Sequence, residues 1–129
     1  MGKNYLIDTN IVSKYFQKRL TENARLMISS LDIDSIYLSV VNRIELLSWL
    51  LEDKNLELDI RDFIKNLPEY GLDEDIIQKT IEIRRKVKIK LPDAIIAATA
   101  VVHNLVLLSD NDTDFLKVPK LKYLNPTKI

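Results

Sequence analysis

The sequence has no cysteine and only one histidine among its 129 residues. Without cysteine, the chain can form neither a disulfide framework nor a thiolate metal site, and its composition agrees with a reducing cytoplasm. A single histidine also disfavours zinc, which usually takes several nitrogen or sulfur ligands. Any metal that the protein binds is therefore expected to have oxygen ligands.

Net charge and long apolar runs are absent as well. Nineteen basic and nineteen acidic residues cancel, so the chain as a whole does not attract nucleic acid, and a polyanion must be met by a local patch or a metal. The first apolar run is only a few residues long before Asp8 interrupts it, and we expect neither a signal peptide nor a membrane span. The hydrophobic content of 47% is enough for the core of one domain, which we expect to span residues 1–129.

Strand-like and helix-like segments alternate along the chain. This order predicts an α/β fold with a central, mainly parallel sheet of four or five strands flanked by helices. Apolar and β-branched runs predict strands at residues 5–7, 36–41, 69–72, 105–108 and 121–124. Helical spacing of apolar residues predicts helices at residues 11–16, 21–31, 43–51, 55–67 and 91–103, with another that begins at the acidic residues 73–75.

The segment from Lys90 to His103 is a helix of mostly small residues that begins beside a carboxylate. Pro92 is favoured in a first helical turn, where its missing N–H costs nothing, and Asp93 then lies at the positive end of the helix dipole. The alanines that follow predict a buried helix. A carboxylate there needs a partner, a hydrogen bond or a cation, so we expect a chemical role for Asp93. His103, in the last turn, is expected to favour the negative end of the dipole and not to act in catalysis.

Further acidic side chains follow the predicted strands. Asp8 ends the first strand, and Glu45 lies in the first turn of a helix that Asn42 is expected to cap. Taken alone, Asp8 is explained equally well as a helix cap, and Glu45 as an acid stabilised by the helix dipole. The polar residues that follow a third strand are Asp110, Asn111, Asp112 and Asp114.

The carboxyl ends of parallel strands meet at one edge of a sheet, so these groups are expected to converge with Asp93. Carboxylates held close together repel one another unless some are protonated or a divalent cation neutralises them. Oxygen ligands favour Mg²⁺, or Mn²⁺, over zinc. Such a site suits phosphoryl chemistry, in which the metal lowers the pKa of an attacking water.

One concentration of basic residues runs directly into the helix that carries Asp93. A charge run is usually a solvated helix face, but one beside an acidic site can instead hold a phosphate backbone. Its members are Arg84, Arg85, Lys86, Lys88 and Lys90.

The helix that carries Glu45 has two apolar stripes. Leu46, Trp49 and Leu50 lie on one face, and Ile44, Leu47 and Leu51 on another. Because one stripe is enough to enter the core, the other suggests contact with a protein partner, although burial explains any single residue in it.

Four segments together resemble the PIN domain, and more narrowly the VapC ribonuclease toxins of prokaryotic toxin–antitoxin pairs. The resemblance covers about Tyr5 to Phe115, and its most specific part is the run from Pro92 to Ala100. It implies a PIN-like three-layer sandwich, a magnesium-dependent endoribonuclease, a homodimer and a small cognate antitoxin that inserts near the active site and holds the enzyme inactive. The segments are Leu6–Asn10, Glu45 after a serine-bearing strand, Leu91–Ala100 and Ser109–Phe115.

By this resemblance, Asp8, Glu45 and Asp93 match the first three acidic positions of the family. The fourth position departs from the pattern, because Asn111 stands where many members have aspartate, whereas Asp114 matches members that carry the acid just before phenylalanine. We expect Asp8 and Asp93 to bind the metal and Glu45 to position or deprotonate the attacking water. Asn111 and Asp114 then complete the shell, with Asp110 or Asp112 as alternatives for the missing charge. Asn10 and the basic run are expected to hold RNA.

Two other readings belong to different classes of protein. A phosphorelay receiver is also a small α/β module with carboxylates at strand ends, but it has adjacent acids after the first strand and a lysine after the last core strand. Here Asp8 is followed by Thr9 and Asn10, and no such lysine follows Ser109. A non-catalytic adaptor that keeps the fold to bind a partner remains the second alternative.

Overall fold

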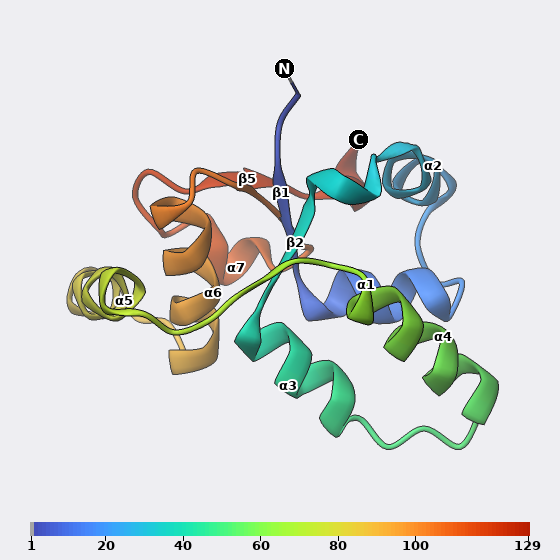
Figure 1. The fold of residues 1–129 in the computed structure, drawn as a ribbon. Helices are drawn as coiled ribbons and strands as arrows, with labels where there is room; N and C mark the ends of the chain where they lie inside the picture. The colour runs from blue at the N-terminus through green and yellow to red at the C-terminus, as the bar shows by residue number, and fades with distance from the viewer. Residues whose placement is uncertain (1) are drawn as a thin grey trace.

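A computed structural model describes residues 2–129 of the protein. Its central feature is a parallel sheet. Within this range the strand order is β3-β2-β1-β4-β5, and every neighbouring pair is parallel (Figure 1). The prediction of a mainly parallel sheet of four or five strands is therefore confirmed. The strands are β1 (Tyr5–Ile7), β2 (Ile36–Ser39), β3 (Glu69–Tyr70), β4 (Val106–Leu108) and β5 (Lys122–Leu124).

Helices connect the strands and cover both faces of the sheet (Figure 1). In residues 2–129, none of them is both long and apolar enough to cross a membrane. The α-helices are α1 (Thr9–Phe16), α2 (Glu22–Ser30), α3 (Val40–Ser48), α4 (Lys54–Lys65), α5 (Glu74–Lys86), α6 (Leu91–Val102) and α7 (Asp112–Phe115). Two 3-10 turns are η1 (Ile33–Ser35) and η2 (Pro126–Lys128).

The sheet separates two hydrophobic cores. Successive residues of a strand point to opposite faces, so Leu6 and Leu107 pack into the core under α5 and α6. Ile7 and Leu108 enter the other core, which α1 and α4 cover. Because both faces are covered, the central strands are short apolar runs without polar alternation. This arrangement is the three-layer sandwich that the sequence predicted.

Helix α6 is buried, as its composition predicts. Ala94, Ala97, Ala98 and Ala100 are fully buried, and the helix packs against α5 (Figure 1). Pro92 lies in the first turn. Alanine has no side-chain atoms beyond the β-carbon, which allows a close approach of the two helices.

The boundary between β2 and α3 differs from the sequence prediction. β2 ends at Ser39, and Val40 and Val41 already belong to α3, although β-branched residues favour strands. Ser39 caps the helix: its Oγ accepts a hydrogen bond from Val41 N, and its own N–H donates to Asn42 Oδ1. The prediction that Asn42 is the cap is wrong, because this serine satisfies the helix end three residues earlier.

Helix α3 is also shorter than predicted at its other end. It ends at Ser48, so Trp49, Leu50 and Leu51 do not continue the two stripes. Leu46 is buried, whereas Ile44 is 59% exposed. Within the helix, the predicted stripes therefore reduce to the buried Leu46, the partly buried Leu47, which packs against the same core, and the exposed Ile44.

Candidate active site

Asp8 lies at the end of the central strand and is 5% exposed. As the N-cap of α1, it accepts a hydrogen bond from Thr9 N at Oδ1, at 2.9 Å. Its Oδ2 accepts from the hydroxyl of Ser109 at 2.8 Å. Strand register explains this second contact. Ile7 of β1 is paired with Leu108 of β4, so the residues that follow the two strands, Asp8 and Ser109, lie side by side. Asp8 is thus both the helix cap and a buried carboxylate at the sheet edge.

The surroundings of Asp8 raise its pKa to about 6. Desolvation by burial is the largest cause, and the charges of Asp93 and Glu45 raise the pKa further. The hydrogen bonds from Ser109 and Thr9 lower it but do not compensate. A carboxyl group in this state gains from any cation that replaces the lost water, so its environment favours a positively charged partner.

Glu45 lies on the same edge but in a different turn than predicted. It is the sixth residue of α3, not a first-turn residue, so the helix dipole does not explain its presence. Its side chain is exposed, and Oε1 accepts a hydrogen bond of 2.6 Å from the Thr9 hydroxyl. Asn42, one turn earlier and fully buried, donates from Nδ2 to Thr9 Oγ1 at 3.2 Å and to Asp8 Oδ1 at 3.4 Å. Two strand ends are therefore joined by hydrogen bonds.

Asp93 is in the first turn of α6, where the sequence placed it. Its pKa is raised, first by partial burial and then by the charges of Asp114 and Glu45, while Lys90 lowers it. These effects require the carboxylates to be close enough to interact. Asp8, Glu45, Asp93 and Asp114, called the acidic cluster below, are therefore linked by charge interactions, each with at least one other member.

The remaining acids after β4 have other partners. Asp110 forms an ion pair with Lys14 of α1. Asp112 pairs with Lys128 and accepts hydrogen bonds from Tyr123 and Asn125, and these contacts, that with Lys128 first, lower its pKa to about 2. Both carboxylates are therefore used in holding the C-terminal segment and α1 in place.

Asn111 caps the short helix α7 and contacts Asp114. Its Oδ1 accepts from Asp114 N at 3.4 Å, and its Nδ2 donates to Asp114 Oδ2 at 3.1 Å. Lys117 also lies 3.8 Å from Asp114. Of the four polar residues after β4, Asp114 is the one whose charge raises the pKa of Asp93.

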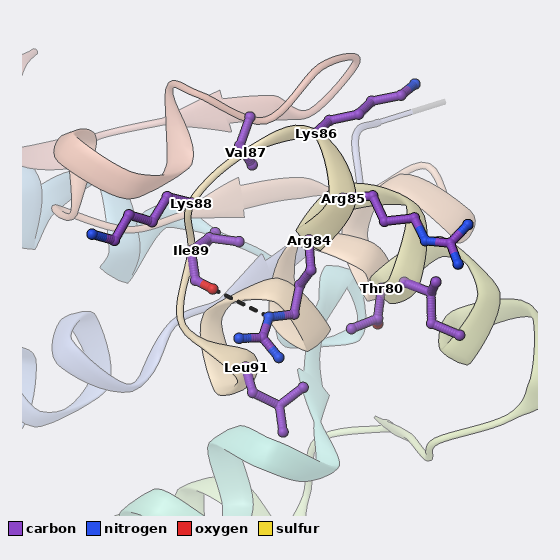
Figure 2. Close-up of a pocket in the computed structure, with 9 residues that line it drawn as sticks. Thr80, Arg84, Arg85, Lys86, Val87, Lys88, Ile89 and Leu91 are labelled. Atoms are coloured by element: carbon purple, nitrogen blue, oxygen red, sulfur yellow. Dashed lines mark hydrogen bonds between the residues drawn. The ribbon is translucent and has the colours of Figure 1, made fainter.

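The basic run lies around a cavity of about 730 Å³ beside the start of α6. Figure 2 shows that Lys88 and Arg85 point to opposite sides of it, so the run does not form one continuous face. Arg84 donates from Nε to the Ile89 carbonyl at 3.3 Å, and Lys86 pairs with Glu82. Helix α5 ends at Lys86 and the chain then extends, which turns successive side chains in different directions.

Lys90 and Asn10 are not among the residues that line that cavity. Lys90 precedes α6 as its N-cap, and its charge lowers the pKa of Asp93. Asn10 is the second residue of α1 and is exposed, two positions after Asp8. Each is therefore within three residues of a carboxylate of the acidic cluster along the chain.

The donor set of the cluster fits a hard divalent cation. Between residues 2 and 129, no group of three His, Cys, Asp or Glu side chains is already gathered closely enough to hold a metal ion. The carboxylates nevertheless influence one another, and the hydrogen-bond donors to Asp8 are neutral. The carboxylates of the cluster offer a metal ion only oxygen atoms, which are the ligands that magnesium and manganese prefer.

Comparison with known families identifies the fold. A model of the PIN domain matches residues 5–121. The chain belongs to the PIN domain family. Membership of this family excludes the phosphorelay receiver considered from the sequence. No curated protein matches the sequence.

Solved structures of similar fold match nearly the whole chain. A toxin–antitoxin complex from Klebsiella pneumoniae is 27% identical, with a TM-score of 0.79, and the match covers 98% of this chain and 100% of that one. FitAcB from Neisseria gonorrhoeae is 24% identical, with a TM-score of 0.81 and coverage of 97% and 99%. DNA-bound VapBC from Salmonella typhimurium is 20% identical, with the same TM-score and coverage. The last two establish similarity of fold.

Sequence reasoning missed three neutral residues of the site. Ser109, Thr9 and Asn42 hold the carboxylates through hydrogen bonds, yet none was assigned a role at the site. One signal was available: Asn42 and Glu45 are three residues apart, a spacing that puts both on one helix face.

Proposed function

We propose that this protein is a magnesium-dependent endoribonuclease that hydrolyses phosphodiester bonds of RNA in the cytoplasm, as the toxin of a VapBC-type pair. The observation that carries the proposal is Asp8, a carboxylate buried at the sheet edge, whose pKa is raised first by desolvation and then by the charges of Asp93 and Glu45. A carboxylate cluster that is unfavourable without a counter-charge is the expected property of a metal-binding nuclease site.

Asp8 and Asp93 would hold Mg²⁺, or Mn²⁺, with Glu45 and Asn111 as further ligands. When bound, the ion supplies a water of lowered pKa and compensates the charge that develops on the phosphate. Thr9 engages one oxygen of Glu45, which leaves the other free to take a proton from water. Asp114 adds negative charge beside Asp93, and its amide partner Asn111 keeps it in place.

The cations and the exposed amide near the cluster are proposed to bind the RNA backbone. Lys90 is the cation whose charge reaches Asp93, so we place the scissile phosphate next to it. Arg84, Arg85 and Lys88 line the adjacent cavity and would contact flanking phosphates. Lys86 is expected to contribute less because it is paired with Glu82. Asn10 would bind a nucleotide through its exposed amide.

Protein partners complete the proposal. The Klebsiella structure, which is a toxin–antitoxin complex, matches this chain over its full length. This similarity supports a small antitoxin as the cognate partner. A homodimer is also proposed, and the exposed apolar side chains Ile44 and Leu91, on the neighbouring helices α3 and α6, support a contact surface there.

Replacement of Asp93 by asparagine tests the nuclease directly. Cleavage of a structured RNA by purified protein is expected to require Mg²⁺, to stop with EDTA, and to fall by at least about 100-fold in D93N, because a metal-bound site contributes several kcal/mol. D75N is the matched control, since Asp75 is an acidic residue in the first turn of α5 and is exposed. Equal activity of D93N and D75N would contradict the assignment and favour the non-catalytic adaptor.

A further inference from the structure

The residue that joins the two acidic strand ends is an amide, Asn42. Its side chain is fully buried between α3 and the start of α1. A buried amide costs free energy unless both its oxygen and its nitrogen have partners. Asn42 has partners on both sides, and they differ in kind: a backbone N–H on one side, and a hydroxyl and a carboxylate on the other.

The backbone determines which way the Asn42 amide faces. The N–H of Ser39 donates to Oδ1 at 3.0 Å, and a backbone N–H cannot act as an acceptor. The amide oxygen must therefore face Ser39, and the NH₂ group must face Asp8 and Thr9. The orientation of the Asn42 amide is therefore determined by the cap of α3 and not by the acidic cluster.

That orientation determines the direction of the next hydrogen bond. Asn42 Nδ2 donates to Thr9 Oγ1, so the threonine hydroxyl cannot donate back to it. Its hydrogen is directed to Glu45 Oε1 at 2.6 Å. The bonds from Ser39 through Asn42 and Thr9 to Glu45 all point the same way, and such chains strengthen each member.

We propose that Asn42 is a positioning residue that directs the Thr9 hydroxyl towards Glu45 and thereby fixes that carboxylate relative to Asp8. The proposal rests on the proposed nuclease function for its kinetic consequence, but not for the hydrogen-bond chain itself. Glu45 is on an exposed surface, where a free side chain would sample many rotamers. Asn42 removes this freedom without touching substrate.

Asn125 provides a matched control elsewhere in the chain. Its Oδ1 accepts from Thr127 N at 2.9 Å, and its Nδ2 donates to Asp112 Oδ1 at 3.0 Å. It is 9% exposed. Asparagine-to-aspartate substitution at either position keeps the acceptor for a backbone N–H, removes the donor and adds a carboxylate beside an existing one.

The first test compares N42D with N125D in RNA cleavage. Both variants are expected to have a lower melting temperature than the native protein. N42D is expected to lose about 10- to 100-fold in kcat at unchanged KM, as is typical when a residue that orients a site ligand is removed. N125D is expected to keep the native kcat. A native kcat in N42D, or an equal loss in both, would overturn the proposal.

A second comparison asks whether Asn42 acts through Thr9. T9S keeps the hydroxyl and should retain most activity, whereas T9V has no hydroxyl at the same volume. The double variant N42D/T9V is expected to be no slower than T9V alone, because both substitutions interrupt the same series of hydrogen bonds. Multiplied losses in the double variant would show that Asn42 acts by another route.

The third readout needs neither RNA nor metal. In ¹⁵N-labelled, metal-free protein, the side-chain amide resonances of Asn42 should shift in E45A, because the chain of hydrogen bonds loses its last acceptor. Those of Asn125 should not move. Unchanged Asn42 resonances would refute the series of hydrogen bonds from Asn42 to Glu45, even if RNA cleavage by the protein is confirmed. The expected shift in a protein that cuts no RNA would support the chain and reject the nuclease.

Discussion

Ser109 donates a hydrogen bond of 2.8 Å from Oγ to Oδ2 of Asp8, and both side chains are buried. The bond crosses from β4 to β1 at the carboxyl edge of the sheet. It is the largest of the effects that lower the pKa of Asp8, but desolvation outweighs it. Ser109 is therefore the main neutral partner of a carboxylate that the fold would otherwise leave poorly solvated.

Substitution of Ser109 by alanine should lower the free energy of unfolding by about 1 to 3 kcal/mol at pH 7.5, because Oδ2 of the buried Asp8 carboxylate and the N–H of Asn111 then lose their partner. Urea denaturation in the presence of EDTA measures this loss. S30A is the control, since the exposed Ser30 hydroxyl donates only to the Met27 carbonyl, at 2.7 Å. Its cost should stay below about 0.5 kcal/mol. Equal stability of the two variants would mean that the Asp8–Ser109 bond contributes nothing.

Stability without metal should fall as the pH rises. The pKa of Asp8 moves from 3.8 to about 6 on folding, so between these values the folded protein holds a proton that the unfolded chain has lost. The associated stability is complete below pH 3.8 and is lost as the pH passes about 6. The shift corresponds to about 3 kcal/mol. The raised pKa of Asp93 acts in the same direction.

The measurement is a series of urea titrations between pH 4 and pH 7.5 with EDTA. D8N, which has no proton to lose at this position, should show a flatter profile than the native protein. Addition of Mn²⁺ should raise the stability of the native protein at the upper end of the range but not that of D8N. A native profile as flat as that of D8N would contradict the burial of a titrating Asp8.

The fourth acidic position can be assigned by comparing D114N with D112N. D114N should reduce RNA cleavage, because its charge acts on Asp93. D112N should leave cleavage near the native rate and instead lower the melting temperature, because Asp112 holds Tyr123, Asn125 and Lys128. The reverse pattern, with cleavage lost in D112N and retained in D114N, would move the assignment to Asp112.

Lys90 and Lys86 should differ in their effect on RNA binding. Replacement of Lys90 by glutamine should weaken binding and reduce the dependence of affinity on salt by about one counterion, as expected for a lost phosphate contact. Replacement of Lys86 should change both much less, because Glu82 already neutralises it. Fluorescence anisotropy with a labelled RNA, in the D93N background to prevent cleavage, gives both quantities. Identical salt dependence in the two variants would place the RNA elsewhere.

The sequence predicted the parts of the site that local signals determine. Strand β1 ends at Asp8 because a short apolar run ends there, and Pro92 fixes the start of the helix that carries Asp93. It did not predict the turn of α3 in which Glu45 lies, since Val40 and Val41 have strand propensity and only the cap at Ser39 makes them helical. Strand propensity predicts secondary structure poorly where a hydrogen-bonded cap determines the start of a helix.

The arrangement of the basic run was also not predictable from its composition. Five cations in seven residues suggest one surface, but the end of α5 at Lys86 turns Arg85 and Lys88 away from each other. Similarly, Asp110 and Asp112 resemble Asp114 in sequence, and their partners Lys14 and Lys128 come from remote parts of the chain. Such pairings depend on tertiary contacts that no local pattern encodes.

The central place of β1 between β2 and β4 also has a consequence for synthesis. Ser109 leaves the ribosome 101 residues after Asp8, so a nascent chain cannot close the site until nearly all of it has been made. Under the proposed nuclease function, a chain therefore cannot cleave RNA until its own synthesis is nearly complete.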